Sequence, residues 1–222
     1  MSSAVKILGI AGGVGAAIIL GIIAYGEMTK PPGSTFLEKP TEQWTVGNSL
    51  RENMVLTYTL SHIDNDYKEL IVTLKFLEKQ DDNWKVAMAV QDQNEIHKAE
   101  LMMTESLVLL GPIPPELQPY GRMVTGSILW IVDYAIEPKY LVNGAVWGSI
   151  IHGVQKEDLK IISSEPVKTD AGTFNSYVLS YTIKDRESKI WIVKDMPLPV
   201  KAMVHDADGN LQFAFNLINV IN

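Results

Sequence analysis

MVLTYTLS, the stretch Met54–Ser61, alternates apolar and polar residues. This period of two is typical of a β-strand with one buried face and one solvated face. The same alternation returns in Leu70–Phe76 and in Trp84–Val90, and the turn residues Asp64–Asp66 and Asp81–Asn83 separate the three runs. The pattern therefore predicts an antiparallel meander with one wet face.

The alternation continues on both sides of a different middle segment. Residues 96–110 fit a further strand, although they fit a helix nearly as well. Glu116–Ile136 has the spacing of one amphipathic helix, with Pro115 suited to its start and Pro138 to its end. Further strands are predicted near Leu141–Ile151, Leu159–Val167, Phe174–Ile183, Lys189–Lys194, Val200–His205 and Leu211–Val220. The predicted fold class is mainly β (α+β), with a large curved antiparallel sheet or half-barrel and one central helix.

The amino terminus carries ILGIAGGVGAAIILGIIAYG, Ile7–Gly26, in which no residue is charged. A helix of this length spans about 30 Å, the thickness of the hydrocarbon core of a bilayer. We expect a single-pass transmembrane signal-anchor helix in the cell membrane. Lys6 before it and Glu27 after it predict a cytoplasmic amino terminus and an extracytoplasmic location for the bulk of the chain. The alternative is a cleaved signal peptide, with Ala24 and Gly26 at the −3 and −1 positions.

The chain is expected to have three parts. These are the anchor (1–26), a linker that contains proline and glycine (27–40) and an extracytoplasmic β-rich domain (41–222). Within the anchor, Gly9 and Gly13 lie four residues apart, a spacing of small residues that lets two membrane helices pack closely. The anchor is therefore a candidate for pairing with other membrane subunits, and the plainer alternative is a single unpaired span.

Composition and charge narrow the function classes. Apolar residues make up 46% and charged residues 20% of the chain, which is typical of a globular protein. A net charge of −7 without a basic run argues against nucleic acid as a partner. The chain has no cysteine, which excludes disulfides, thiolate catalysis and a lipidated cysteine. No cofactor is predicted.

The carboxyl-terminal third has a familiar order of segments. Val167–Phe174, which contains Ala171-Gly172-Thr173, is followed by Ser188–Val193, Pro197–Lys201 and Leu211–Leu217. Over about 55 residues, this order resembles exported bacterial and archaeal domains of the half-barrel, lipoprotein-carrier-like kind. The resemblance implies a long antiparallel sheet that curls around a helix and leaves an apolar cleft. The chain differs in lacking a lipidated cysteine and in carrying an anchor, which argues against a freely diffusing carrier.

Recognisable catalytic and metal-binding motifs are absent from the sequence. His62–Asp66 and His205–Gly209 each place a histidine beside two aspartates, and such side chains can ligate a metal. Both lie where the strand pattern requires a turn, and Asp, Asn and Gly are ordinary turn residues. We therefore expect solvated turns, no metal site and no enzyme, although a triad of distant residues would not be visible in one sequence.

The large apolar side chains outside the clearest alternation are candidates for a binding cleft. Trp130, Trp147, Trp191, Met102 and Met103 are expected either to fill the core or to line an apolar cleft. Two functions follow. The first is a membrane-anchored binding module that holds a lipid or other lipophilic ligand between sheet and helix. The second is a non-catalytic accessory or scaffold subunit of a larger membrane complex, which should have a filled interior and an exposed apolar patch.

Overall fold

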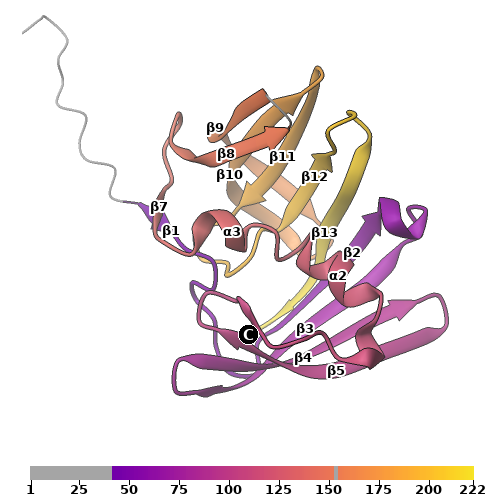
Figure 1. The fold of residues 1–222 in the computed structure, drawn as a ribbon. Coiled ribbons are helices and arrows are strands. Elements are labelled where there is room, and N and C mark those ends of the chain that lie inside the picture. The colour runs from indigo at the N-terminus through magenta and orange to yellow at the C-terminus, as the bar shows by residue number, and fades with distance from the viewer. Residues whose placement is uncertain (1–41, 153–154) are drawn as a thin grey trace, which may run out of the picture. The chain divides into compact units, whose positions relative to one another are not determined.

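The computed structural model describes residues 42–152 and 155–222. Its main element is one open antiparallel sheet of eleven strands in the order β6-β5-β4-β3-β2-β13-β12-β11-β10-β9-β8 (Figure 1). The strands are β2 (Val55–His62), β3 (Leu70–Gln80), β4 (Asn83–Asp92), β5 (Glu95–Thr104), β6 (Leu109–Leu110), β8 (Val146–His152), β9 (Gln155–Thr169), β10 (Gly172–Ile183), β11 (Arg186–Ile192), β12 (Lys201–His205) and β13 (Leu211–Ile221). The prediction of a mainly β fold with a large antiparallel sheet is confirmed.

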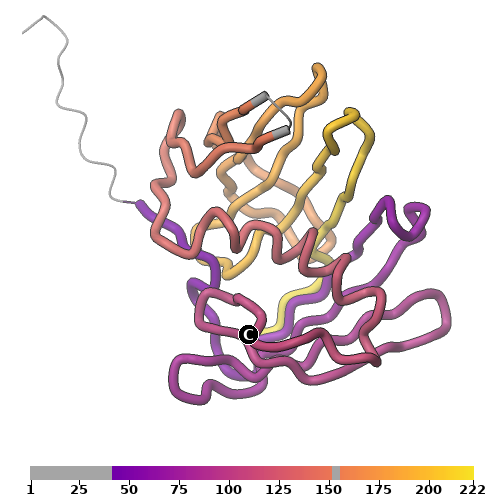
Figure 2. The backbone as a smooth tube through the Cα atoms, viewed as in Figure 1, coloured from indigo at the N-terminus to yellow at the C-terminus, as the bar shows by residue number. Residues whose placement is uncertain are grey.

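Two consecutive meanders make up this sheet, and they meet at its centre. β2 pairs with β13, so that Leu60 lies opposite Phe215 (Figure 2, indigo beside yellow). The period of two holds within the strands, because Leu56, Tyr58 and Leu60 are buried while the residues between them are partly exposed. The prediction of a further strand over residues 96–110 is confirmed for 96–104, which lie in β5, but the chain then turns and residues 109–110 form the separate antiparallel strand β6.

The sheet curves around the segment between β6 and β7 (Figure 1). Irregularities in strand pairing explain how it bends, because a β-bulge puts two residues opposite one and kinks the strand. Such register shifts occur at Phe76/Glu78, Val146/Gly148, Val178/Leu179, Val204/His205 and Leu217/Asn219.

The prediction of one helix over Glu116–Ile136 is wrong. The structure has three short helical turns instead: η2 (Pro115–Leu117), α2 (Tyr120–Thr125) and α3 (Val132–Ala135). Pro119 has no N–H and favours an extended backbone at Gln118, whose ψ is 137°, so η2 cannot continue into α2. The helical spacing of apolar residues nevertheless correctly marked the buried side of this segment, at Leu117, Val124, Ile128, Ile131 and Ala135.

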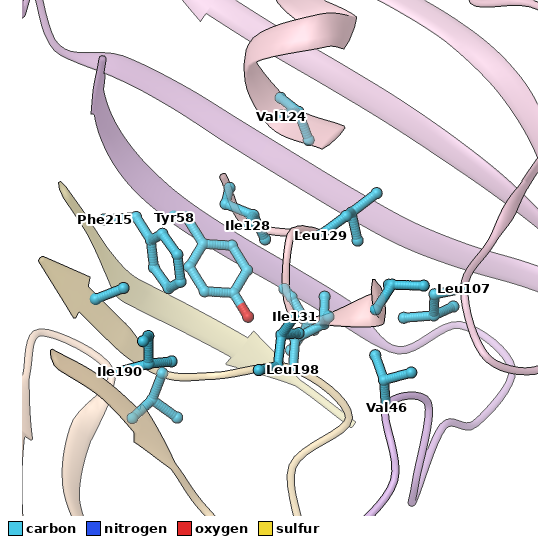
Figure 3. Packing of buried hydrophobic residues seen from close by; sticks show 14 of the residues in the cluster. Val46, Tyr58, Leu107, Val124, Ile128, Leu129, Ile131, Ile190, Leu198 and Phe215 are labelled. Carbon is cyan, nitrogen blue, oxygen red and sulfur yellow. The ribbon is translucent and has the colours of Figure 1, made fainter. Parts of the chain in front are cut away.

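The core lies between the inner face of the sheet and this crossing segment. Figure 3 shows Tyr58 and Phe215 beside Ile128, Ile131 and Leu198. The rings of Tyr58 and Phe215 meet edge to face, with centroids 5.6 Å apart. Within the described residues the buried Tyr58 hydroxyl has no hydrogen-bond partner, and burial raises the pKa of Tyr58 far above its ordinary value.

A short second sheet ties the start of the described chain to the domain. β1 (Gln43–Trp44) pairs antiparallel with β7 (Lys139–Tyr140). The indole N–H of Trp44 donates to the carbonyl of Met196 at 2.8 Å. Gly47 follows with a positive φ of 81°, and a Cβ at this position would lie 2.1 Å from the carbonyl oxygen of Glu105. Only glycine therefore fits here without moving the turn after β5.

The structure leaves the membrane predictions open. No helix within residues 42–152 and 155–222 is long and apolar enough to cross a bilayer. The predicted anchor Ile7–Gly26, including Gly9 and Gly13, lies outside the described residues, as does the linker. Anchor, orientation and helix pairing therefore stay predictions.

Candidate binding site

Aromatic side chains gather on the inner face near strands β8 and β10. The ring of Trp130 lies 4.8 Å from that of Tyr134 and 6.3 Å from that of Tyr181. Tyr134 packs closely on Gly148 of β8, where a Cβ would come within 2.7 Å of its ring. Burial raises the pKa of both Tyr134 and Tyr181, so both hydroxyls stay neutral at physiological pH. The cluster thus fixes the crossing segment on the sheet.

Trp147 occupies a separate position at the end of the domain. Its ring stacks on that of Trp44, with centroids 5.7 Å apart and an interplanar angle of 16°. Its indole N–H donates to the carbonyl of Tyr140 at 3.1 Å. Because Trp147 is buried, this stack anchors β8 against β1 and β7.

The five residues predicted for an apolar cleft do not come together. Met103 is buried on the inner face, whereas Met102 alternates with it on β5 and is partly exposed. Trp191 lies between the buried residues Ile190 and Ile192 and therefore points to the outer face. There its indole N–H donates to Glu165 Oε1 at 2.9 Å, and the Lys201 ammonium lies 5.4 Å from its ring.

The most apolar of the five main hollows in the described ranges lies on the outer face of β3, β4 and β5. It has a volume of about 430 Å³, and the small residues Thr73, Ala87 and Ala89 form its floor. The exposed side chains of Lys75, Lys98 and Glu100 line its rim. None of the five predicted cleft residues lines this hollow or the four others found in the described ranges. The sequence prediction of an apolar cleft lined by them therefore stays a prediction.

Ser188 and His205 place a serine hydroxyl beside a histidine ring, the contact that a nucleophile and its base would make. The Ser188 hydroxyl oxygen is 3.5 Å from His205 Nδ1, and it accepts the backbone N–H of His205 at 2.9 Å. Ser188 is fully buried, and no ion pair to the His205 ring occurs in the described part of the chain. A nucleophile needs access to substrate and a base that a third group orients. This pair instead links β11 to the end of β12.

The two histidine-containing turns have local structural roles. His62 Nδ1 accepts the backbone N–H of Asp64 at 3.1 Å and caps η1 (Ile63–Asn65). In the other turn, Asp206 Oδ1 accepts the backbone N–H groups of Asp208 and Asn210. Across the described residues no group of three or more histidine and acidic side chains is arranged to hold a metal ion.

Exposed apolar side chains are frequent along one segment of the chain, which runs from the end of α3 through β7 into β8 (Figure 1). Twelve large apolar side chains are exposed in the described ranges, and five of them fall within residues 136–151. We call these five the apolar end: Ile136, Tyr140, Val142, Val146 and Ile151. Ile151, at 70%, is the most exposed of the twelve.

Sequence reasoning missed the apolar end. The alternating pattern near Leu141–Ile151 predicted a strand, and β8 occupies its second half. The pattern could not show that this strand lies at the edge of the sheet. The available signal was the absence of any Asp, Glu, Lys or Arg from VWGSIIH, Val146–His152. Natural edge strands usually carry such charges as protection against pairing.

Comparison with known proteins identifies no family. No family model matches the sequence, and no curated protein matches it. Among solved structures, a Bacteroides fragilis protein described as exported and YmcC-like in fold is 10% identical, with 81% of this chain and 100% of that chain covered and a TM-score of 0.44. MucB is 12% identical, with 78% of this chain and 54% of the MucB chain covered and a TM-score of 0.42. In the MucA/MucB complex of Pseudomonas aeruginosa the matched chain is 13% identical, with 76% of this chain and 50% of that chain covered and a TM-score of 0.40. The matched chain spans about half of MucB, and similarity at this level says nothing about function.

Proposed function

We propose that this protein is a non-catalytic accessory subunit whose extracytoplasmic β domain docks on another protein through the apolar end. The observation that carries the proposal is the concentration of exposed apolar side chains within residues 136–151. Scattered exposed apolar residues are ordinary on a protein surface, whereas a group of them commonly marks an interaction site. The predicted anchor would hold the domain beside a membrane partner.

The filled interior also supports docking in preference to carriage of a ligand. The crossing segment presses Leu117, Ile128 and Ile131 against the inner face, and all three are almost completely buried. A lipid held there would have to displace side chains that already pack at the density of a protein core. A docking module needs no such space, because its binding surface lies outside.

The proposal is tested with the full-length chain in its native membrane. A double variant, Val146→Lys with Ile151→Lys, places two charges on the apolar end, and Ile96→Lys is the matched control because Ile96 is 64% exposed at another hairpin. After chemical cross-linking, purification and quantitative mass spectrometry, we expect one protein to be enriched with the wild type and the control. It should be depleted at least tenfold with the double variant. An identical set of proteins with all three chains would contradict the proposal.

A lipophilic ligand is the second candidate, and the outer hollow favours it. A floor of Thr73, Ala87 and Ala89 suits an apolar group. On the rim, Lys75 and Lys98 suit an anionic head, and the Glu100 carboxylate beside them is already paired with Lys85 Nζ at 2.9 Å. Substitution Ala89→Trp should fill the hollow. If mild extraction and mass spectrometry find a lipid on the wild type that is lost from this variant, the carrier function holds and docking alone is insufficient. If neither sample carries a lipid, this candidate fails.

A further inference from the structure

Strand β8 is a complete edge strand without the usual protection. Among residues 42–152 and 155–222 its one neighbour in the sheet is β9, so no described strand lies along the other side of its backbone. Its seven residues include no Lys, Arg, Asp, Glu or Pro. Proteins normally guard such edges with charge, proline or very short strands, because unpaired N–H and C=O groups accept another chain. β8 therefore has the features of a strand that another chain can extend.

The hydrogen-bond phase identifies which amides point outward. Ile161 N–H donates to the carbonyl of Ala145 and its carbonyl accepts the N–H of Gly144, so Gly144 and Ala145 together occupy a hydrogen-bonded position opposite Ile161. Bonded and non-bonded pairs alternate along an antiparallel ladder, and the bulge at Val146/Gly148 places two residues opposite Leu159. Ile150 consequently bonds to β9, whereas Ser149 and Ile151 direct their backbone groups to the free edge.

The side chains along β8 indicate the chemistry of the incoming strand. Val146 and Ile151 are 53% and 70% exposed, and they lie opposite Lys160 and Lys156 of β9. Neither lysine forms an ion pair with any residue in the described ranges, and Asp158, opposite Ser149, lies between them. An incoming strand would place apolar side chains beside Val146 and Ile151 and acidic side chains toward the two lysines.

We propose that β8 binds an extended segment of the partner protein as a twelfth strand of the sheet. The segment alternates apolar with polar residues and carries acidic residues at its ends. Main-chain hydrogen bonds to Ser149 and Ile151 supply affinity, and the side chains beside Val146 and Ile151 supply selectivity. This inference rests on the proposed docking function and specifies the form that the partner takes.

The test uses the full-length chain in a mild detergent and a fluorescent peptide in which valine alternates with threonine between terminal glutamates. Ser149→Pro removes an outward N–H and leaves the bonds to β9 intact. Ile96→Pro is the matched control on the opposite edge, where Thr104 N–H donates to the Val108 carbonyl and so sets the even-numbered amides of β5 outward. Fluorescence anisotropy measures the Kd. We expect Ser149→Pro, or N-methylation of alternate peptide residues, to raise the Kd at least tenfold, and Ile96→Pro to change it less than twofold.

The outcomes separate this inference from the proposed function. If the peptide binds wild type and Ser149→Pro equally, strand addition is wrong. The docking function is then still tested separately, by the cross-linking experiment with the lysine variants of Val146 and Ile151. If the chain self-associates and Ser149→Pro abolishes this, β8 pairs with a second copy and the inference of a separate partner is overturned. Thermal unfolding checks the variants: Ser149→Pro should unfold cooperatively near the wild-type temperature, and Ile150→Pro, which breaks the β8–β9 ladder, should unfold well below it.

Discussion

The two edges of the sheet are built differently. At one edge β6 has only two residues, and the chain then enters Gly111-Pro112-Ile113-Pro114-Pro115, where three residues have no N–H to offer a neighbouring strand. The adjacent strand β5 exposes the charged side chains of Glu95, Lys98 and Glu100 beside one apolar side chain, Ile96. At the other edge β8 has seven residues without Asp, Glu, Lys or Arg, and two of its apolar side chains are strongly exposed. The same fold thus protects one edge by the usual means and leaves the other available for binding.

An unguarded edge must still be held in place, and Trp147 is the residue that holds it. We predict that Trp147→Ala destabilises the protein by about 3–5 kcal/mol, because it removes a buried indole and its stack on Trp44. Leu109→Ala, in β6 at the protected edge, should lower the free energy of unfolding clearly less, because Leu109 is only partly buried. Urea unfolding of both variants measures the difference. Equal losses would show that the two edges are anchored alike.

Two glycines near the protected edge at β6 allow the effect of close packing on stability to be distinguished from the effect of backbone conformation. Gly47 and Gly111 both have positive φ, but only Gly47 would place a Cβ against backbone, at the Glu105 carbonyl. We predict a loss of at least about 3 kcal/mol for Gly47→Ala, which combines strain with a clash. For Gly111→Ala we predict about 1–2 kcal/mol from φ alone. Comparable losses in chemical denaturation would mean that the contact between Gly47 and the turn after β5 is not tight.

At the centre of the sheet, between the two edges, one substitution should raise the stability of the protein or leave it unchanged. Tyr58→Phe removes a buried hydroxyl that has no partner, so we predict a gain of about 1 kcal/mol or no loss. Tyr181→Phe is the control, since its hydroxyl donates to the carbonyl of His205 at 3.3 Å, and its loss should cost about 0.5–1.5 kcal/mol. A clear destabilisation by Tyr58→Phe would show that the hydroxyl is satisfied in solution and that the interior is less tightly filled.

The smallest effect concerns His62, at the end of β2. Burial lowers the pKa of His62 in the folded protein, and the carboxylate of Asp64 partly offsets this. The unfolded chain therefore takes up the proton first, at about pH 6.5, and stability should fall as the pH decreases from 7.5 to 5.5. His62→Gln should reduce this slope in urea unfolding at the two pH values. Identical slopes for wild type and variant would contradict a lowered pKa.

Local patterns predicted most of the strands but little of their order. Alternation located β2–β4 and β9–β13 because each strand buries one face and carries its own turn residues. The pairing of β2 with β13 joins distant segments, and nothing within either strand encodes it. The prediction of one helix over Glu116–Ile136 was wrong because it relied on the helical spacing of apolar residues. Pro119 and Gly126 interrupt the helix, and their effect was not taken into account. Of the tryptophans expected to fill the core or line a cleft, Trp147 is buried and Trp130 is partly buried, whereas alternation on β11 turns Trp191 outward.

The exposed edge of β8 is the central claim, and amide hydrogen exchange of the full-length chain, resolved by NMR without added partner, tests it most directly. Ser149 and Ile151 should exchange at least a hundredfold faster than Ile150, because only Ile150 donates to β9. Uniform slow exchange at all three amides would contradict the account, since the free edge of β8 would then be covered already.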